Sequence, residues 1–154
     1  MTQAPSLIRH SNPLATALLR LGVPMGPNVL LTVRGRRSGV PRTVPVAVPE
    51  IGGRRYVMGA YGDVAWVRNL RAAGRGTIHQ DGRDVPVRAV ELDPARAKAF
   101  FRSLPSYVAS FPWYGRVFGR ALFGAVAPEL LTDPDRASKL HPVFELVAEP
   151  RQAG

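Results

Sequence analysis

Two turn dipeptides, set between short β-branched segments, restrict the fold of this 154-residue chain more than any other feature. Asp81-Gly82 has the composition of a type I′ turn, in which both central residues need a positive φ angle. Gly52-Gly53 is a second dipeptide of the same class. Strands joined by two-residue turns pair antiparallel, because parallel strands need a long crossover. The chain is therefore expected to fold around an antiparallel sheet.

The segments around these turns predict six strands and several helices. The expected strands are residues 29–33, 41–49, 54–60, 75–80, 83–92 and 142–149. The expected helices are residues 13–22, 64–73, 94–104, 113–127 and a short one after Asp133-Pro134. Six antiparallel strands with helices outside them favour a small barrel in the α+β class. Residues 1–27 are expected to form an N-terminal arm with an amphipathic helix, and residues 28–150 a single domain.

Prolines and caps refine these boundaries. Pro41, Pro45 and Pro49 cannot donate to a ladder, so their strand is expected at an edge or a bulge of the sheet. Asp63 is the expected N-cap of the helix at 64–73, and Pro105 is expected to end the helix that begins near residue 94.

Composition excludes several classes of site. The chain has no cysteine, which excludes disulfides, thiol catalysis and cysteine-ligated metal centres. Its three histidines are far apart in sequence and have no metal-ligand spacing, so we expect no metal site. No signal peptide or membrane-spanning stretch is evident, which favours a cytoplasmic protein. Peripheral membrane contact through the N-terminal amphipathic helix is a minor alternative.

The charge of the chain indicates an anionic partner. The formal net charge is +10, and residues 1–60 carry eight arginines against a single acid, Glu50. The densest basic segment runs from Gly35 to Thr43 and holds three arginines and a serine within seven residues. Such a loop can offer guanidinium, hydroxyl and backbone N–H groups to an anion, although a solvated basic turn is the alternative. The start of the helix at residue 65 is a second candidate anion seat.

Two segments together resemble a known family. The run Gly-Arg-Arg-Ser-Gly-x-Pro-Arg-Thr-x-Pro at 35–45, Gly59-Ala60-Tyr61-Gly62, and Trp66-x-x-Asn69 resemble the deazaflavin (F420)-dependent nitroreductases, small split β-barrel oxidoreductases of actinobacterial type. The likeness covers about residues 29–92. It implies an antiparallel split barrel of six to seven strands with flanking helices, and hydride transfer from reduced coenzyme F420 to an acceptor.

The resemblance also implies a division of the coenzyme site. The phosphate and carboxylate tail would contact Arg36, Arg37, Ser38 and Arg42. The deazaflavin ring would lie along Thr43, Val44, Pro45, Val46 and Ala47, and Met58, Gly59, Ala60 and Tyr61 would close another side. Ala65, Trp66, Val67, Arg68 and Asn69 would lie at the phosphate and the ring. The acidic Asp63 is compatible with a phosphate seat only if its charge is used elsewhere, for instance as the helix cap.

The acceptor side of the site is expected in the aromatic run at residues 106–114. Tyr107 and Tyr114 are the candidate catalytic residues there, because the reduced acceptor needs a proton and both side chains carry a hydroxyl. The apolar neighbours suit a quinone, an enone or a nitro-aromatic, although they could equally be core. Two alternatives remain open at this point: an FMN-binding split barrel, and a carrier of deazaflavin or lipid without turnover. Nucleic acid is not an expected partner, whereas a homodimer through the proline-rich edge or residues 113–127 is compatible with the sequence.

Overall fold

The computed structural model describes residues 28–113, 116–117 and 127–150 of the chain. Within them the strands are β1 (Asn28–Arg34), β2 (Pro41–Ala47), β3 (Glu50–Ile51), β4 (Arg54–Met58), β5 (Arg75–Gln80), β6 (Arg83–Glu91) and β7 (Val143–Ala148). The helices are α2 (Ala65–Ala73), α3 (Pro94–Ala109), α5 (Glu129–Thr132) and α6 (Pro134–Leu140). The helix predicted at 13–22 and most of the one predicted at 113–127 lie outside the described residues.

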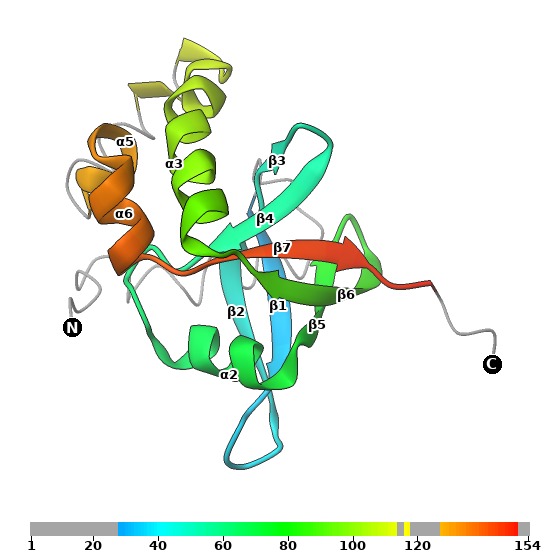
Figure 1. Ribbon diagram of the computed structural model, residues 1–154. Coiled ribbons are helices and arrows are strands. Elements are labelled where there is room, and N and C mark those ends of the chain that lie inside the picture. The colour runs from blue at the N-terminus through cyan, green and yellow to red at the C-terminus, as the bar shows by residue number, and fades with distance from the viewer. Residues whose placement is uncertain (1–27, 114–115, 118–126, 151–154) are drawn as a thin grey trace.

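The described strands form one antiparallel sheet, which curls into an open barrel (Figure 1). Its seven strands have the order β2-β1-β5-β6-β7-β4-β3, so β2 and β3 are the two edges. The chain passes from one edge to the other through Val48 and Pro49. The prediction of an α+β split barrel with six to seven antiparallel strands is confirmed, and so is the edge position of the strand that holds Pro41 and Pro45.

The two turn dipeptides gave one correct pairing and one wrong one. Asp81 has φ 51° and Gly82 has φ 73°, as a type I′ turn between β5 and β6 requires. Gly52 and Gly53 also have positive φ angles, but they join β4 to the two-residue strand β3 and not to the long strand β2. On its other side, β4 pairs with β7, which is distant in sequence. β3 could not be predicted from the sequence, because a strand of two residues is too short to show an alternation of apolar and polar side chains.

The predicted end of the helix at 94–104 was also wrong. α3 continues through Pro105 to Ala109, although proline cannot donate the hydrogen bond to the turn before it. Phe101, Leu104 and Val108 are all buried on the face of α3 that packs on the sheet and on α6. Burial on both sides of Pro105 outweighs the loss of one backbone hydrogen bond, so the helix persists past it.

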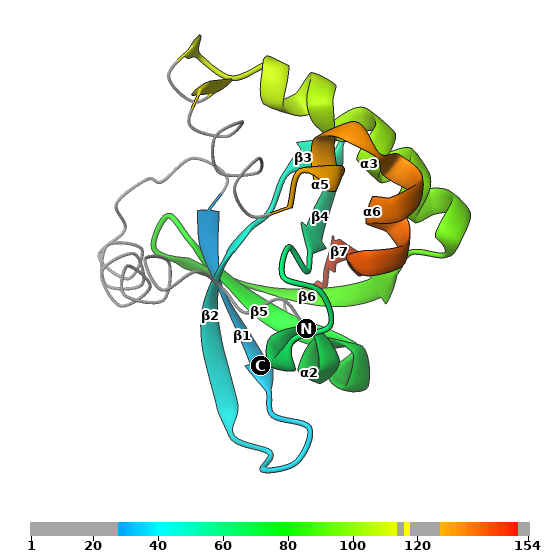
Figure 2. The ribbon, with the colours of Figure 1, turned by 90° about the vertical axis from the view of Figure 1, so that its left-hand side faces the viewer.

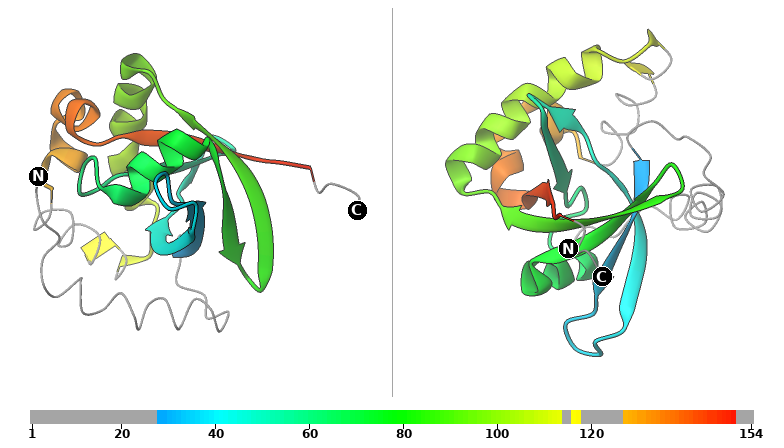
Figure 3. Two further views of the ribbon diagram at one scale, coloured as in Figure 1. Left: turned by 90° about the horizontal axis from the view of Figure 1, so that it is seen from below. Right: turned by 90° about the vertical axis from the view of Figure 1, so that its right-hand side faces the viewer.

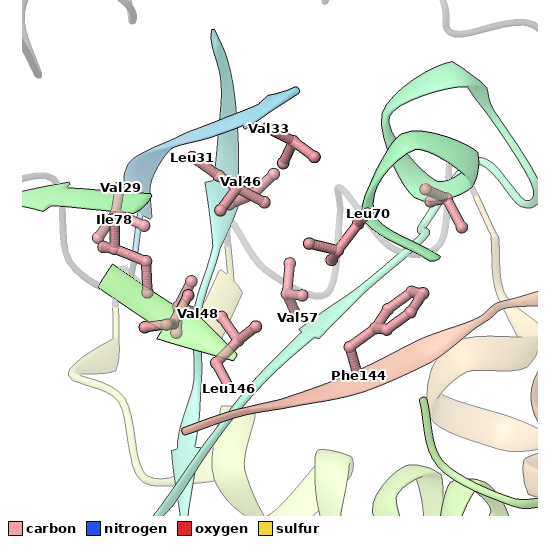
Figure 4. Close-up of a cluster of buried hydrophobic side chains, with 12 residues drawn as sticks. Val29, Leu31, Val33, Val46, Val48, Val57, Leu70, Ile78, Phe144 and Leu146 are labelled. Atoms are coloured by element: carbon pink, nitrogen blue, oxygen red, sulfur yellow. The ribbon is translucent and has the colours of Figure 1, made fainter. Parts of the chain in front are cut away.

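Two hydrophobic clusters divide the interior. The first fills the curl of the sheet, where side chains of β1, β2, β4, β7 and α2 point toward one another (Figure 4). The second lies between α3, α5, α6 and the end of β7. α2 therefore covers one end of the barrel beside the β1–β2 loop, and the other helices gather at the opposite end (Figure 2). The views in Figure 3 show the same separation.

Candidate functional site

The basic loop between β1 and β2 has a fixed shape. Gly35 donates to the carbonyl of Val40 (2.9 Å), Gly39 donates to the carbonyl of Gly35 (2.9 Å), and the N–H of Val40 donates to Ser38 Oγ (3.2 Å). A Cβ on Gly35 would come within 2.9 Å of Ser38 Oγ, and Gly39 has φ +71°, so glycine is required at both positions. The loop thus presents its arginines on a preformed backbone.

The loop is tied to α2 through one buried amide. Asn69 Oδ1 accepts hydrogen bonds from Arg36 Nη1 (2.9 Å) and from the backbone N–H of Arg36 (3.2 Å). Asn69 is only 8% exposed. The two candidate anion seats, the loop and the start of α2, therefore lie at the same end of the barrel.

The charges at this end are arranged unequally. Among the described residues, Arg37 and Arg42 form no hydrogen bond or ion pair, and both are exposed. Arg68 instead lies against Asp63, with Nε 3.0 Å from its carbonyl oxygen and 3.7 Å from its carboxylate. Arg71 pairs with the same carboxylate at 2.9 Å and with Glu91 at 2.7 Å.

The predicted capping role of Asp63 was wrong. The N-cap of α2 is Val64, and no side chain caps it. The carboxylate of Asp63 is occupied by Arg68 and Arg71, so its negative charge is compensated in a different way from the expected one. These ion pairs compensate the charge of Asp63, so this acid is compatible with an anion-binding site beside it.

β2 has one face toward the interior, one face toward the outside, and one edge that is not paired with a described strand. Val44 and Val46 lie on the inner face beside the first cluster, whereas Thr43 lies on the outer face with its hydroxyl 2.8 Å from that of Thr32. The register continues this alternation, so Pro45 and Ala47 face outward with Thr43. β2 pairs only with β1 among the described strands, which leaves the polar groups of its second edge open to a ligand.

The segment from Met58 to Tyr61 is fixed by a residue pair that the sequence reading did not find. Gly59 donates to the carbonyl of Pro142 (2.8 Å), and its own carbonyl accepts from His141 Nδ1 (3.0 Å). The other ring nitrogen of His141 lies 2.8 Å from Glu129 Oε1. No sequence signal connects residues 59, 129 and 141, because the segments after β4, in α5 and before β7 come together only in the folded protein.

Electrostatics follow from this geometry. Both nitrogens of the buried His141 ring lie within hydrogen-bond distance of oxygen atoms, Nδ1 of the Gly59 carbonyl and Nε2 of the Glu129 carboxyl. The hydrogen bond from His141 holds the pKa of the Glu129 carboxyl below its ordinary value. A hydrogen-bonded pair of a buried histidine and a partly buried glutamate therefore stands directly behind the Gly59 segment.

The start of α2 divides into side chains that face outward and side chains that do not. Ala65 is exposed, Trp66 is half-buried against the first cluster, and Val67 is fully buried. Only the backbone of Val67 is thus available to a ligand. Of the predicted residues on this helix, Asn69 and Arg68 already have protein partners.

The structure describes one of the two candidate catalytic tyrosines, Tyr107. Tyr107 lies near the C-terminal end of α3, half-buried, with its ring 4.9 Å from that of Phe111. Burial raises the pKa of Tyr107, and Glu50 on β3 raises it further. This end of α3 lies across the molecule from the β1–β2 loop (Figure 1). Tyr114 lies outside the described residues.

Within residues 28–113, 116–117 and 127–150, no cluster of three or more metal-ligating side chains occurs. No helix in these ranges is long and apolar enough to cross a membrane.

Comparison with known proteins decides the family. Residues 15–123 match the model of the F420H(2)-dependent quinone reductases. The chain belongs to the F420H2-dependent quinone reductase family. It is therefore an F420-dependent reductase with F420 as its coenzyme, and the alternatives of an FMN protein and a non-catalytic carrier are set aside. A search among curated proteins found no match.

Solved structures resemble this quinone reductase family member at the level of the fold. One described as a domain-swapped dimer is 20% identical, with a TM-score of 0.52, and the match covers 92% of this chain and 98% of that one. A putative 5-nitroimidazole antibiotic resistance protein from Bacteroides thetaiotaomicron is 8% identical, with a TM-score of 0.55 and coverage of 87% and 80%. A structure described as an F420-H2 dependent reductase is 22% identical, with a TM-score of 0.49 and coverage of 79% and 94%.

The residues of this quinone reductase family member suit the coenzyme at its anionic end. F420 carries a phosphodiester and a carboxylate tail, and the β1–β2 loop presents two exposed arginines, Arg37 and Arg42, that have no partner among the described residues. The loop is held by Asn69 before any ligand arrives, which lowers the ordering cost of binding.

Proposed function

We propose that the chain transfers a hydride from reduced F420 to an apolar acceptor such as a quinone, an enone or a nitro-aromatic. The observation that supports this most is the combination of a preformed loop, unpaired arginines and an open strand edge at one end of the barrel. When bound, the reduced deazaflavin supplies the hydride, and the protein supplies position, charge and exclusion of water.

The tail of the coenzyme would be held by the loop and the helix beside it. Arg36, Arg37, Ser38 and Arg42 would contact phosphate and carboxylate oxygens. Arg36 is already oriented by Asn69, whereas Arg37 and Arg42 have both their charge and their donors available. The backbone N–H groups of Ala65, Trp66 and Val67 would complete the phosphate seat, because the first N–H groups of a helix have no partner within it, whereas the N–H of Arg68 donates to the Val64 carbonyl.

The ring would lie further along β2. Pro41 and Ala47 are six residues apart, which is about 20 Å along a strand. A tail bound at the loop therefore places the ring toward Thr43–Ala47, with contacts largely from the backbone of the open edge. The segment Met58–Tyr61 would close the opposite side, held in place by His141 and Glu129.

Tyr107 would donate the proton that the acceptor needs. Hydride addition to a carbonyl or quinone leaves a negative oxygen, and a positioned hydroxyl both stabilises that charge and can protonate it. A tyrosine is protonated at neutral pH, and burial raises the pKa of Tyr107 above its ordinary value, so its hydroxyl is available as a hydrogen-bond donor. Tyr114 remains the second candidate for the same role.

We also propose that the chain forms a homodimer and is located in the cytoplasm. Trp113 is 70% exposed and Val117 is 64% exposed, so an apolar surface lies near the proposed acceptor side. A homodimer through this surface or through the β2 edge would cover it, and gel filtration with light scattering would show a mass near twice 16.7 kDa. A cytoplasmic location, with or without peripheral membrane contact, remains the prediction from the sequence.

A turnover assay tests the proposed function. Purified protein is mixed with reduced F420 and, in separate reactions, with a water-soluble quinone, an enone and a nitro-aromatic. We expect at least one acceptor to oxidise the coenzyme at a rate proportional to enzyme concentration. If none of the three is reduced while F420 still binds, the proposed acceptor class is wrong although the coenzyme site stands.

A further inference from the structure

Three arginines form a row across the outer face of the sheet. Arg75 on β5 stands directly opposite Arg88 on β6 in the antiparallel register. On the other side of β5, Thr77 pairs with Thr32 of β1. Two positions from this pair, on the same face of the sheet, Arg75 of β5 lies beside Arg34 of β1. Adjacent strands are about 4.8 Å apart, so three guanidinium-bearing strands span roughly 10 Å.

The row is poorly compensated by the rest of the protein. The nearest carboxylate is that of Glu149, 3.6 Å from Arg75. Neither Arg34 nor Arg88 forms a hydrogen bond or an ion pair within the part of the chain that the structure describes, and all three arginines are exposed. Like charges placed directly opposite in a sheet are destabilising, so the fold alone gives no reason for this arrangement.

A pocket lies over the row. Its volume is about 1110 Å³, and all three arginines line it together with Thr77, Val147 and Glu149. Thr77 adds a hydroxyl that has no protein partner among the described residues. The pocket opens on the outer face of the sheet, whereas Val44 and Val46 of the proposed coenzyme strand face the interior.

We propose that the row Arg34–Arg75–Arg88 is a second anion site, which binds a ligand bearing phosphate groups. The planar fork of arginine matches phosphate oxygens in pairs, and a row of three suits a ligand with at least two negative charges. Such phosphates come either from the headgroups of anionic lipids or from a free phosphorylated molecule. This inference is independent of the proposed hydride transfer, because it uses other residues. Thr43, Pro45 and Ala47 face the same side of the sheet, but none of them lines the pocket.

The test is a titration with inorganic pyrophosphate, followed by the backbone amide signals of a ¹⁵N-labelled protein. The amides of Gly76 and Thr77 report on the row, and those of Arg37 and Ser38 report on the β1–β2 loop. A parallel experiment measures co-sedimentation with vesicles of phosphatidylglycerol in phosphatidylcholine, and with phosphatidylcholine vesicles alone.

Three triple variants remove the same charge from different places. R34Q/R75Q/R88Q removes the row, R36Q/R37Q/R42Q removes the loop arginines, and R83Q/R102Q/R136Q is a control on other exposed positions. We expect at least tenfold weaker binding at the row reporters in the first variant. In the second and third variants the row reporters should respond within twofold of the wild type. Dispersed amide spectra confirm that each variant is folded.

The two sources of phosphate give different results. Saturable shifts at Thr77 with pyrophosphate, without vesicle binding, indicate a free phosphorylated ligand. Co-sedimentation that needs phosphatidylglycerol and is lost only in the row variant indicates lipid headgroups. The proposal is overturned if neither probe binds, if the control variant loses as much binding as the row variant, or if the loop variant abolishes the response at the row.

Discussion

The two ends of this protein differ in how some of their basic side chains are paired. At the end with α3 and α6, three basic side chains have close carboxylate partners: Lys98 with Asp135 at 2.5 Å, Arg96 with Glu145 at 2.7 Å, and His141 with Glu129 at 2.8 Å. At the end with the β1–β2 loop, Arg37 and Arg42 have none among the described residues.

The difference separates structural charges from those that wait for a ligand. Paired groups at the helical end complete each other, so removing one affects the fold rather than binding. Unpaired arginines on a preformed backbone repel one another and gain a partner only when an anion binds. The count of arginines in the sequence could not make this distinction, since both ends are basic.

The largest expected effect lies at the helical end and so tests whether that end is purely structural. Replacing Tyr107 with Phe keeps the shape and removes the donor, and should lower turnover by roughly 10²–10³-fold. Steady-state kinetics with a quinone measures this, and coenzyme affinity should be almost unchanged. If turnover is normal, the proton comes from water or the coenzyme. If affinity falls instead, Tyr107 belongs to the coenzyme site.

The second effect concerns the buried pair behind Gly59. Replacing Glu129 with Gln removes the carboxylate that pairs with the buried His141 ring, and it should lower the free energy of unfolding by roughly 1.5–3 kcal/mol, as for a hydrogen bond to a charged group. Thermal unfolding at pH 7 measures the loss. A loss no larger than that of an exposed substitution such as Arg102→Gln would show that the pair contributes little.

The pH dependence of the same pair has a defined sign. The pKa of Glu129 is lower in the folded protein than its ordinary value of 4.5. Its stabilisation is therefore fully present above about pH 4.5 and is lost as pH falls through the lowered folded pKa. The wild type should lose stability more steeply than Glu129→Gln in that acidic window, and equal slopes would contradict the assignment.

The third effect tests the unpaired end. Arg37→Ala or Arg42→Ala should each weaken F420 binding about ten- to a hundredfold, because a charge-assisted hydrogen bond contributes roughly 1.5–3 kcal/mol. Arg96→Ala is the matched control from the paired end and should leave affinity unchanged. Calorimetric titration measures all three. An equal loss in the control would mean that only overall charge matters.

The smallest effect concerns the tie between the loop and α2. Asn69→Ala removes the acceptor that orients Arg36, and affinity for F420 should fall about two- to tenfold, as for one ordinary hydrogen bond. Arg36→Ala in the same background should then cost less than it does in the wild type, because the two residues act as a unit. Additive losses would show that Asn69 does not position Arg36.

Much of the fold could be predicted because its signals are local. The positive φ angles of Asp81 and Gly82 follow from their residue types, and the glycine at position 74 ends α2 in the left-handed conformation that this residue type favours. The errors arose where tertiary contacts decide. Packing carries α3 through Pro105, and two arginines brought close by α2 take Asp63 away from the helix cap.

The site shows the same limit. Its loop is a continuous run of sequence, so its residues could be identified from the motif. His141, Glu129 and the row of Arg34, Arg75 and Arg88 come together only through strand order, and no spacing in the chain indicates that they meet.

The most direct test of the central claim is a binding titration of oxidised F420 against FMN over a range of salt concentrations, in the wild type and in R37A/R42A. The unpaired arginines predict that the wild type binds F420 in preference to FMN, with an affinity that falls as salt rises. The double variant should bind F420 far more weakly and show little salt dependence. FMN binding as tight as that of F420, or an unchanged salt dependence in the double variant, would contradict the assignment of the loop as the coenzyme's anion seat.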